Sequence, residues 1–380
     1  MSAPDISPNA PLPEVEQSSQ WKLMWLVFRR HRVAVVGGVI VLSFYFIAAF
    51  AEILAPFAPN STSSSHVYHP PQAPRLIYDT PENGRGFALH VQAYTQVRDP
   101  FTLSTKYELD PDRVIFISFL GKGQPYKLWG LIPMERRLFT ATNQNERYFF
   151  FGADRLGRDM FSRVIHGTRV SMSIGLVGVA LSLILGVTLG GISGYMGGVT
   201  DAVIQRFVEL VLALPTIPIW LGLSAALPQD WSPLTRYFAI TAILSLVGWT
   251  ELARVVRGRF LALRTEDFVI SARLDGATRR RVILRHMAPS MASHIIASVT
   301  LAIPLMIIAE TSLSFLGLGL QPPMVSWGVL LREAQNVQSI SQAPWLFIPG
   351  AAVVLAVLAL NFLGDGIRDA ADPYSEVQTS

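Results

Sequence analysis

The chain has 380 residues, of which 51% are hydrophobic and only 15% are charged, whereas a soluble globular protein carries about a quarter charged residues. This composition argues against a soluble enzyme. The net charge is only +4, which argues against a general nucleic-acid binder. No cysteine is present, so disulfides, thiolate metal sites and cysteine nucleophiles are excluded.

Residues 1–32 precede the first apolar stretch. The first 20 are rich in Pro, Ser and Asn and contain little apolar sequence, which is typical of a disordered segment. Residues 21–32 contain one lysine and three arginines and no acidic residue. Because basic residues beside a membrane span are retained on the cytoplasmic side, we expect 1–32 to be a cytoplasmic tail.

Six windows are long and apolar enough to cross a bilayer, which takes about 20 residues of helix. The first could be the core of a signal peptide, but 32 residues precede it, so we interpret 33–56 as an uncleaved transmembrane anchor. The fourth is short, although an apolar face continues from it to Val256. The windows are Val33–Ala51, Val170–Thr200, Leu210–Gln229, Tyr237–Thr250, Met287–Ala309 and Trp345–Leu363.

A basic segment follows the fourth window. Residues 254–285 contain nine arginines and three acidic residues, which places this segment in the cytoplasm. Four crossings from a cytoplasmic N-terminus bring the chain back to the cytoplasm at residue 257, and six crossings leave the C-terminus there too. The pattern therefore predicts an all-α polytopic membrane protein with six transmembrane helices and both termini in the cytoplasm.

The first two windows are separated by about 110 residues. Within them, Arg113–Leu120 and Arg147–Phe151 are aromatic and β-branched and are bounded by turn residues, so we expect strands there. We predict that 57–150 is a β-rich extracytoplasmic insertion; the alternative is a long ordered loop across the membrane face. His66 and His69 lie three residues apart with no third ligand nearby, so we interpret them as an exposed loop pair rather than a metal site.

The basic segment predicts two short helices around a turn, within a hairpin that covers residues 257–289. Thr265 can cap the first helix, and Gly276 stands where a left-handed C-cap is needed. Thr278 can cap the second helix, and Pro289 follows shortly after its expected end. One alternative is a solvated loop that only fixes the topology. We favour a hairpin that docks on a soluble partner.

The residues of this hairpin resemble a known motif. Residues 267–289, DFVISARLDGATRRRVILRHMAP, resemble the EAA loop of permeases of binding-protein-dependent ABC importers. Gly276 matches the glycine of that loop, and His286 and Pro289 match its end in the peptide branch. Ile270-Ser271-Ala272 stand where Glu-Ala-Ala is usual, so the spacing is kept while two residues of the motif differ.

Further stretches resemble the C-type permease subunit of the oligopeptide, dipeptide and nickel importers. They are Phe151–Ser171, Tyr195–Pro215, Glu310–Trp327 and Pro344–Pro373, and together they extend over about residues 150–373. Several such matches in one chain are far more specific than one short motif. The long segment before Phe151 resembles the Yej-type peptide importer permease.

The resemblance implies a type I ABC importer permease fold, with 151–380 as the permease core. It implies a heterodimer with a B-type permease subunit, cytoplasmic ABC ATPase subunits and an extracytoplasmic peptide-binding protein, in the inner membrane of a bacterium. Coupling to the ATPase would fall on the residues of the hairpin. These are Asp267, Ser271, Ala272, Arg273, Asp275, Gly276, Arg279, Arg280, His286 and Pro289.

The sequence contains no phosphate-binding loop. Gly121-Lys122 is followed by Gly123 and lacks the earlier glycine that the loop requires. We therefore expect no catalytic site, metal or cofactor in this chain, and ATP and Mg²⁺ only at the partner ATPase subunits. The predicted activity is import of oligopeptides or peptide-like compounds by alternating access, with nickel or dipeptide import as the alternatives within the family.

Two patterns inside the predicted spans admit more than one interpretation. Gly191-Ile192-Ser193-Gly194 matches the Gly-x-Ser-Gly of intramembrane serine proteases, with His294 as a conceivable base. We favour helix packing, because Gly186, Gly190 and Gly194 lie four residues apart and form one small-residue face. Glu310 lies within or at the edge of a span, where it either bonds neighbouring helices or contributes to a gate.

Overall fold

The computed structural model describes residues 20–80, 84–98, 105–228 and 230–371. Five helical stretches are long and apolar enough to cross a membrane, and a sixth span results if a bent pair of helices is counted as one. The five stretches are Arg32–Ala49 (α2), Met160–Met196 (α4), Pro233–Leu263 (α7), Ile295–Phe315 within α11 (Ala292–Phe315), and Pro344–Ala370, most of which is α14 (Ile348–Ala371). The polytopic helical fold is therefore confirmed, and the bounds of the spans differ from those predicted.

The third predicted span is not one straight helix. It comprises the end of α5 (Gly198–Ala213) and all of α6 (Thr216–Ala225), and the two helices are bent by 86° at Leu214-Pro215. Proline lacks a backbone N–H and disfavours the helical conformation of the residue before it. The prediction of a continuous Leu210–Gln229 helix was wrong, because apolar content alone ignores this break. Gln229 itself lies outside the described residues.

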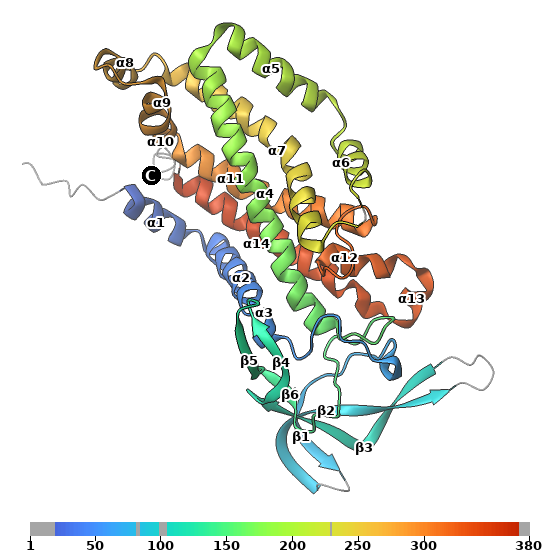
Figure 1. The fold of residues 1–380 in the computed structure, drawn as a ribbon. Coiled ribbons are helices and arrows are strands. Elements are labelled where there is room, and N and C mark those ends of the chain that lie inside the picture. Colours follow the sequence, from blue (N-terminus) through green and yellow to red (C-terminus); the bar gives the residue numbers. More distant parts are fainter. Residues whose placement is uncertain (1–19, 81–83, 99–104, 229, 372–380) are drawn as a thin grey trace, which may run out of the picture.

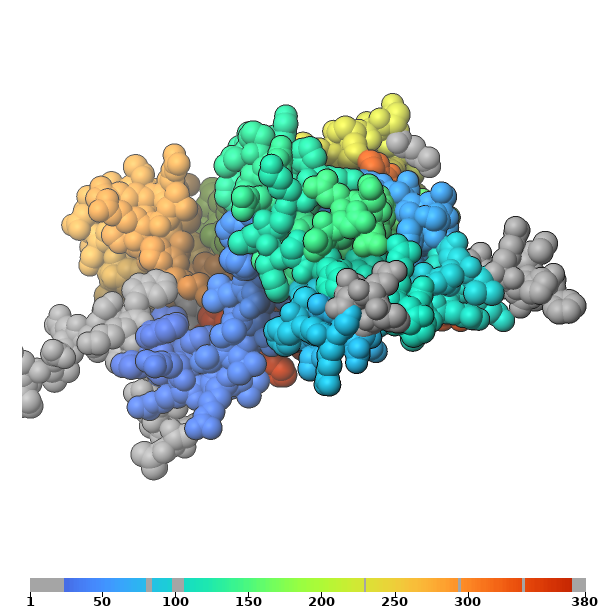
Figure 2. Space-filling view, turned by 90° about the horizontal axis from the view of Figure 1, so that it is seen from below, coloured from blue at the N-terminus to red at the C-terminus, as the bar shows by residue number. Residues whose placement is uncertain are grey.

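The arginine-rich hairpin and the β-strands lie at opposite ends of the helical bundle (Figure 1). The helix α1 (Gln20–Arg30), part of the predicted tail, packs beside the C-terminal part of α14, near the arginine-rich hairpin. A ring of Phe28 approaches the backbone of Gly366 there. The strands lie at the other end, and viewed from that end they cover the middle of the face (Figure 2).

Trp327 lies in the largest buried cluster, among residues of α2, α4, α7, α11 and α14. Its side chain is fully buried, and its ring meets that of Phe44 edge-on at 5.5 Å between centroids. Its backbone N–H donates to Ser171 Oγ at 3.1 Å, and its indole N–H donates to the carbonyl of Val164 at 3.3 Å. The short helix α12 (Trp327–Leu331) is thereby fixed against α4.

A β-rich insertion is present between α2 and α4. Four antiparallel strands are ordered β1-β2-β3-β6, and two more form a separate hairpin, β4-β5. Their bounds are Arg75–Thr80 (β1), Gly84–Arg98 (β2), Thr105–Phe119 (β3), Lys122–Leu128 (β4), Ile132–Arg136 (β5) and Phe139–Ala141 (β6). Short helices precede this region, namely α3 (Ala51–Leu54) and the 3-10 turn Ser64–His66.

One of the two predicted strands is correct and one is wrong. Residues 113–119 form the end of β3, paired with β2 through Val91 and Ile115. Arg147–Phe151 forms no strand: the backbone N–H of Phe149 donates to Gln72 Oε1 at 2.7 Å, and its carbonyl accepts from Gln72 N at 2.8 Å. Tyr148 and Phe149 are buried, and Gln72 satisfies both backbone groups of Phe149 in place of a neighbouring strand.

His69 is buried, so the prediction of an exposed histidine pair was wrong. Its ring lies between those of Tyr107 and Phe149, each 4.8 Å away between centroids, and Nδ1 donates to the carbonyl of Pro70 at 2.8 Å. His66 Nδ1 is hydrogen-bonded to Ser63 Oγ at 2.7 Å. Among the described residues, no cluster of three or more His, Cys, Asp or Glu side chains could hold a metal ion.

We expect His69 to make the stability of the insertion depend on pH. Burial lowers the pKa of His69 from 6.5 to about 4, so the neutral ring stabilises the fold fully above pH 6.5, and this contribution is lost as the pH falls toward 4. Local opening around His69, measured by hydrogen exchange corrected for the intrinsic rate, should become easier by about 2–3 kcal/mol between pH 7.5 and pH 4.5. His69→Phe should remove most of this dependence and leave the part due to His66, whose pKa burial also lowers. An equal loss of local stability at pH 4.5 in the variant and the parent would contradict the attribution of the pH dependence to His69.

Candidate functional sites: the arginine-rich hairpin and the buried polar contacts

The hairpin begins where α7 ends and contains two helical arms. The first arm is α8 (Asp267–Leu274). The second begins with α9 (Arg279–Arg281), continues through a π-helical stretch, Val282–Met287, and ends with α10 (Ala288–Ser290). The predicted hairpin started at residue 257, but 257–263 still belong to α7. Figure 1 shows both arms at the end of the bundle opposite the sheet.

Gly276 closes the first arm in the left-handed conformation that its position predicts, with φ +79°. The N–H of Ala277 donates to the carbonyl of Ala272 at 3.0 Å, and that of Gly276 donates to Arg273 at 3.1 Å. These two bonds are the pattern of a Schellman motif, which satisfies carbonyls at a helix end. The sharp turn between the arms therefore requires a residue without a side chain at position 276.

The helix caps differ in part from the prediction. Thr278 caps the second arm, because its Oγ1 accepts from the N–H of Arg281 at 3.4 Å. Thr265 does not cap the first arm: its hydroxyl donates back to the carbonyl of Ala262 at 3.1 Å, and Glu266 is the N-cap residue. Pro289 lies inside α10 rather than after the end of the second arm, which continues to Ser290. The stretch Val282–Met287, which precedes Pro289, is π-helical. Such single π-helical turns often occur at functional sites.

The hairpin has a buried side and an exposed side. Val269, Ala272, Val282 and Met287 are buried in one cluster with Phe260 of α7. The remaining residues predicted for coupling are exposed, except His286, which is half-buried. The exposed ones are Asp267, Ser271, Arg273, Asp275, Gly276, Arg279, Arg280 and Pro289.

The exposed side also carries apolar side chains that the sequence interpretation did not single out. Phe268 and Ile270 are 41% and 42% exposed, and Leu274 is 82% exposed. Ile270 and Leu274 lie four residues apart on the side of α8 away from the buried Val269 and Ala272, so a helical-wheel reading of α8 would have revealed these two; Phe268 lies at the edge of the buried side. Exposed apolar residues surrounded by arginines are typical of a protein-protein contact.

The small-residue face of α4 packs directly on α7. A Cβ on Gly190 would lie 2.4 Å from the carbonyl oxygen of Ala253, and one on Gly194 would lie 2.7 Å from that of Arg257. A Cβ on Gly186 would meet Leu252 Cβ at 2.9 Å. At Gly190 and Gly194 no side chain separates the two backbones, so α4 and α7 are in van der Waals contact there.

Ser193 belongs to the motif that resembles that of intramembrane serine proteases, and its hydrogen bonds help to join α4, α5 and α7. Its Oγ donates to Asp201 Oδ1 of α5 at 2.5 Å and accepts from Gln205 Nε2 at 3.0 Å. Asp201 also accepts two hydrogen bonds from the guanidinium of Arg257 on α7, at 2.5 and 2.6 Å. The hydroxyl is fully buried in this contact, and the side chain of His294 lies outside the described residues.

Glu310 is fully buried and is bonded to hydroxyl groups of three segments. Its Oε1 accepts from Ser314 Oγ and Ser326 Oγ, both at 2.7 Å, and its Oε2 accepts from Ser171 Oγ at 3.4 Å. Ser171 and Ser326 in turn accept the N–H groups of Trp327 and Val329. This placement supports bonding between α4, α11 and the start of α12; a gate role stays a proposal.

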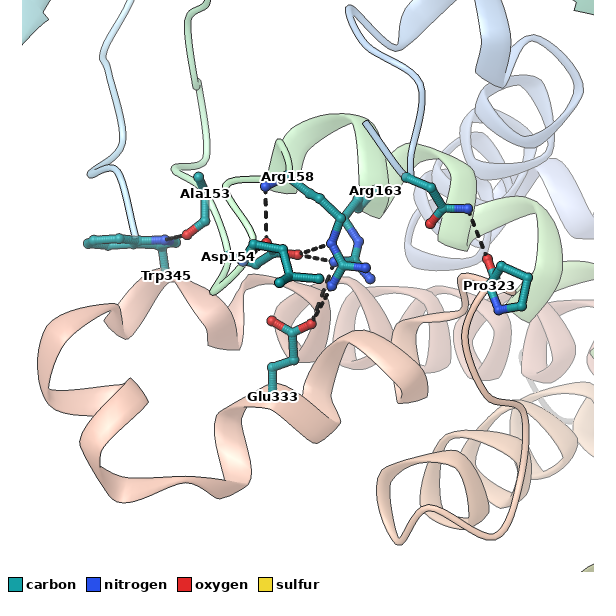
Figure 3. A network of polar contacts seen from close by, with 9 residues as sticks. Ala153, Asp154, Arg158, Arg163, Pro323, Glu333 and Trp345 are labelled. Carbon is teal, nitrogen blue, oxygen red and sulfur yellow. Dashed lines mark hydrogen bonds and ion pairs between the residues drawn. The ribbon is translucent and has the colours of Figure 1, made fainter. Parts of the chain in front are cut away.

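A buried network of charges, which the sequence interpretation missed, lies at the sheet end of the bundle (Figure 3). Asp154 accepts from the guanidinium groups of Arg158, at 2.6 Å, and of Arg163. Arg158 also donates to Glu333 Oε1 at 2.7 Å. The chain before α4 is thereby joined to the 3-10 turn Arg332–Gln335, which follows α12. Removing one partner from a buried ion pair costs about 3–5 kcal/mol, so this end of the bundle is firmly fixed.

Two family comparisons match this architecture. Residues 186–375 match the inner membrane component of binding-protein-dependent transport systems, and residues 19–71 match the N-terminal transmembrane domain of oligopeptide transport permease C. The chain therefore belongs to the family of inner membrane components of binding-protein-dependent transport systems. Within it, the chain is a C-type permease subunit, as the sequence motifs predict.

Curated relatives agree with this assignment. A putative peptide permease of Brucella ovis is 39% identical over 67% of this chain and 80% of its own length. The oligopeptide permease protein OppC of Haemophilus influenzae is 38% identical over 62% of this chain and 74% of its own length. The dipeptide permease protein DppC of Alkalihalophilus pseudofirmus is 30% identical over 96% of this chain and 94% of its own length.

The third relative bears on the insertion. Because it matches nearly the whole chain, the length of the segment before Phe151 does not by itself single out the Yej-type permease. The subfamily stays a prediction. The family assignment agrees with the lack of a phosphate-binding loop in the sequence: the chain is a transport subunit and not an enzyme.

The α4–α7 contact predicts that Gly190→Ala is destabilising. The added methyl group would overlap the Ala253 carbonyl, and overpacking of this kind costs about 1–3 kcal/mol. Gly258→Ala is the matched control, since nothing lies within 4 Å of its added Cβ and alanine favours a helix. Unfolding of the purified protein in mild detergent, followed by tryptophan fluorescence, measures both variants. Equal stability of Gly190→Ala and the parent would contradict the close backbone contact.

Proposed function

We propose that the chain is the membrane-spanning permease subunit of an ATP-driven importer that moves oligopeptides or peptide-like compounds into the cytoplasm by alternating access. The peptide substrate is supported by the names of the relatives, which are peptide, oligopeptide and dipeptide permeases. Dipeptides remain the second candidate, because a dipeptide permease matches nearly the whole chain. No feature of the described residues favours nickel.

The observation that carries the proposal is the exposed side of the hairpin. Ile270 and Leu274 lie four residues apart on one side of α8 and are exposed, and the arginines of the hairpin are exposed as well, so the bundle itself leaves this surface uncovered. We propose that this surface binds a cytoplasmic ABC ATPase subunit, which holds ATP and Mg²⁺. The buried side of the same hairpin packs on α7, so a movement of the ATPase would be transmitted to the spans through rigid helices.

The remaining partners follow from the family. We propose a B-type permease subunit as the second half of the pore and an extracytoplasmic binding protein that delivers the peptide. The membrane orientation is part of this proposal, with α1, the C-terminal end of α14 and the hairpin in the cytoplasm of a bacterium and the sheet outside its inner membrane. The basic residues beside α2 and α8 support this orientation.

The protease interpretation has no support from the geometry. The Ser193 hydroxyl donates to a carboxylate that Arg257 already holds in a bidentate pair, so the hydroxyl is committed to helix packing. A nucleophilic serine needs a base that accepts its proton.

Leu274→Asp tests the docking surface. A charge in place of an exposed apolar anchor should remove about 1.5–3 kcal/mol of binding energy and weaken ATPase binding at least about tenfold, without unfolding the chain. The measurement is the affinity of the purified ATPase subunit for the permease complex. Leu131→Asp is the matched control, because Leu131 is 79% exposed but lies in the turn between β4 and β5. Equal binding of the ATPase by the two variants would contradict the proposal.

A further inference from the structure

The helix α5 presents three different faces. One face packs on the bundle: Val208 is fully buried with Trp249 and Ala253 of α7, and Ile204 is packed against them. The second face is apolar and exposed. It consists of Val199, Val203, Phe207, Leu210 and Leu214, spaced three or four residues apart. Figure 1 shows that α5 runs along the outside of the bundle from the end of α4 to α6.

The third face is charged. Arg206 Nη1 donates to Glu209 Oε2 at 3.0 Å, and the two side chains are 86% and 55% exposed. An exposed ion pair three residues apart on a helix stabilises it by at most about 1 kcal/mol. Stability of the helix therefore does not account for two charges at this place.

The depth of this pair decides what it faces. The Asp201–Arg257 pair fixes the start of α5. At 1.5 Å per residue, Arg206 and Glu209 lie about 12 and 16 Å along the helix from its first residue, Gly198. A bilayer core is about 30 Å thick, so the pair lies near its middle if α5 and α6 form the broken third span. A charge facing lipid at that depth costs about 2.5–3.5 kcal/mol or more, and charges inside membranes face either the interior of a helix bundle or a water-filled cavity. Because both side chains are exposed, at 86% and 55%, the pair does not face the interior of this bundle.

We infer that the Arg206–Glu209 face of α5 lines the water-filled route and contacts the charged ends of the transported peptide. This inference rests on the proposed function and names the residues that meet the substrate. A zwitterionic peptide suits the site, because its carboxylate can accept from Arg206 while its ammonium group donates to Glu209. The internal ion pair is then exchanged for two new ones, at little net cost in desolvation.

Single cysteines test whether this face is wet. The natural chain has no cysteine, so Arg206→Cys, Glu209→Cys and Phe207→Cys each introduce the only thiol of this subunit. Phe207 is the matched control, because it directly follows Arg206, is exposed at 51%, and lies on the apolar face, about 160° around the helix from Glu209. The probe is a bilayer-impermeant charged thiol reagent, applied to the complete transporter in proteoliposomes with the unsubstituted subunit as the blank.

The two polar-face thiols should react at least about tenfold faster than the Phe207→Cys thiol, since apolar surroundings raise a thiol pKa and each unit lowers the thiolate fraction tenfold. Their labelling from the hairpin side should also fall when ATP and vanadate trap the transporter, because alternating access closes that side of the route. Equal labelling at all three positions, or labelling that ignores the nucleotide state, would overturn the inference. The second pattern would indicate a helix lying at the membrane surface.

Arg206→Gln and Glu209→Gln test the contact with the peptide ends. The peptide is chosen from a panel of tripeptides to pentapeptides as one that the parent transporter imports. Each variant should lower its uptake at least about tenfold, the effect of losing one charge-assisted bond of about 1.5–3 kcal/mol, while ATPase binding stays unchanged. Unchanged uptake by both variants would overturn the contact. If the parent imports no peptide, the proposed function fails, and the labelling pattern still decides whether the face is wet.

Discussion

The backbones of α4 and α7 are in direct contact, and this contact sets the spacing between the two longest helices of the bundle. Glycines at 190 and 194 bring the backbone of α4 directly onto that of α7, so the two longest helices of the bundle pack as one unit. The helix α7 continues without a break to Leu263, just before the hairpin, and Phe260 packs both on the glycine face and in the hairpin cluster. A displacement of the hairpin would therefore reach α4 through packed helices rather than through a flexible loop.

Charged residues are paired and buried at one end of the bundle and exposed at the other. At the sheet end, Asp154, Arg158, Arg163 and Glu333 are paired with one another and shielded from water, which fixes the chain before α4 to the segment after α12. At the hairpin end, the arginines of α8 and α9 are exposed. An arrangement with a fixed sheet end and an exposed hairpin end suits a subunit that receives force from one side. Between the ends, the buried Glu310 relies on serine hydroxyls, which hold α4, α11 and α12 in register.

Much of the fold could be predicted from the sequence, because long apolar windows and the distribution of arginines are strong signals in a membrane protein. The break at Pro215 and the true length of α7 were missed for opposite reasons. Apolar content hides a proline, and the charged residues Glu251, Arg254 and Arg257 made the end of a helix resemble a loop. The aromatic segment Arg147–Phe151 has strand composition, but its backbone pairs with one distant residue, Gln72, which no local pattern reveals.

The candidate sites also divide into local features, which the sequence could predict, and contacts between distant residues, which it could not. The turn at Gly276 and the cap at Thr278 depend on neighbouring residues, and both could be read from the sequence. The Ser193–Asp201–Arg257 contact and the Asp154 network join residues of separate segments, so spacing along the chain could not place them together. Family motifs included several of these residues without showing which of them meet. The exposed faces of α5 and α8 could have been predicted in part, since helical periodicity separates exposed from buried positions but does not show what an exposed face contacts.

The central claim is that hydrolysis of ATP by a partner moves peptide through this chain by way of the hairpin. The most direct measurement is ATP-driven uptake of a labelled peptide by proteoliposomes that contain the complete transporter, carrying either the natural hairpin or Arg279 and Arg280 both replaced by alanine. We expect uptake that requires ATP and is lost with the substituted hairpin, although the bundle remains folded. Uptake that continues undiminished with the substituted hairpin would contradict the claim.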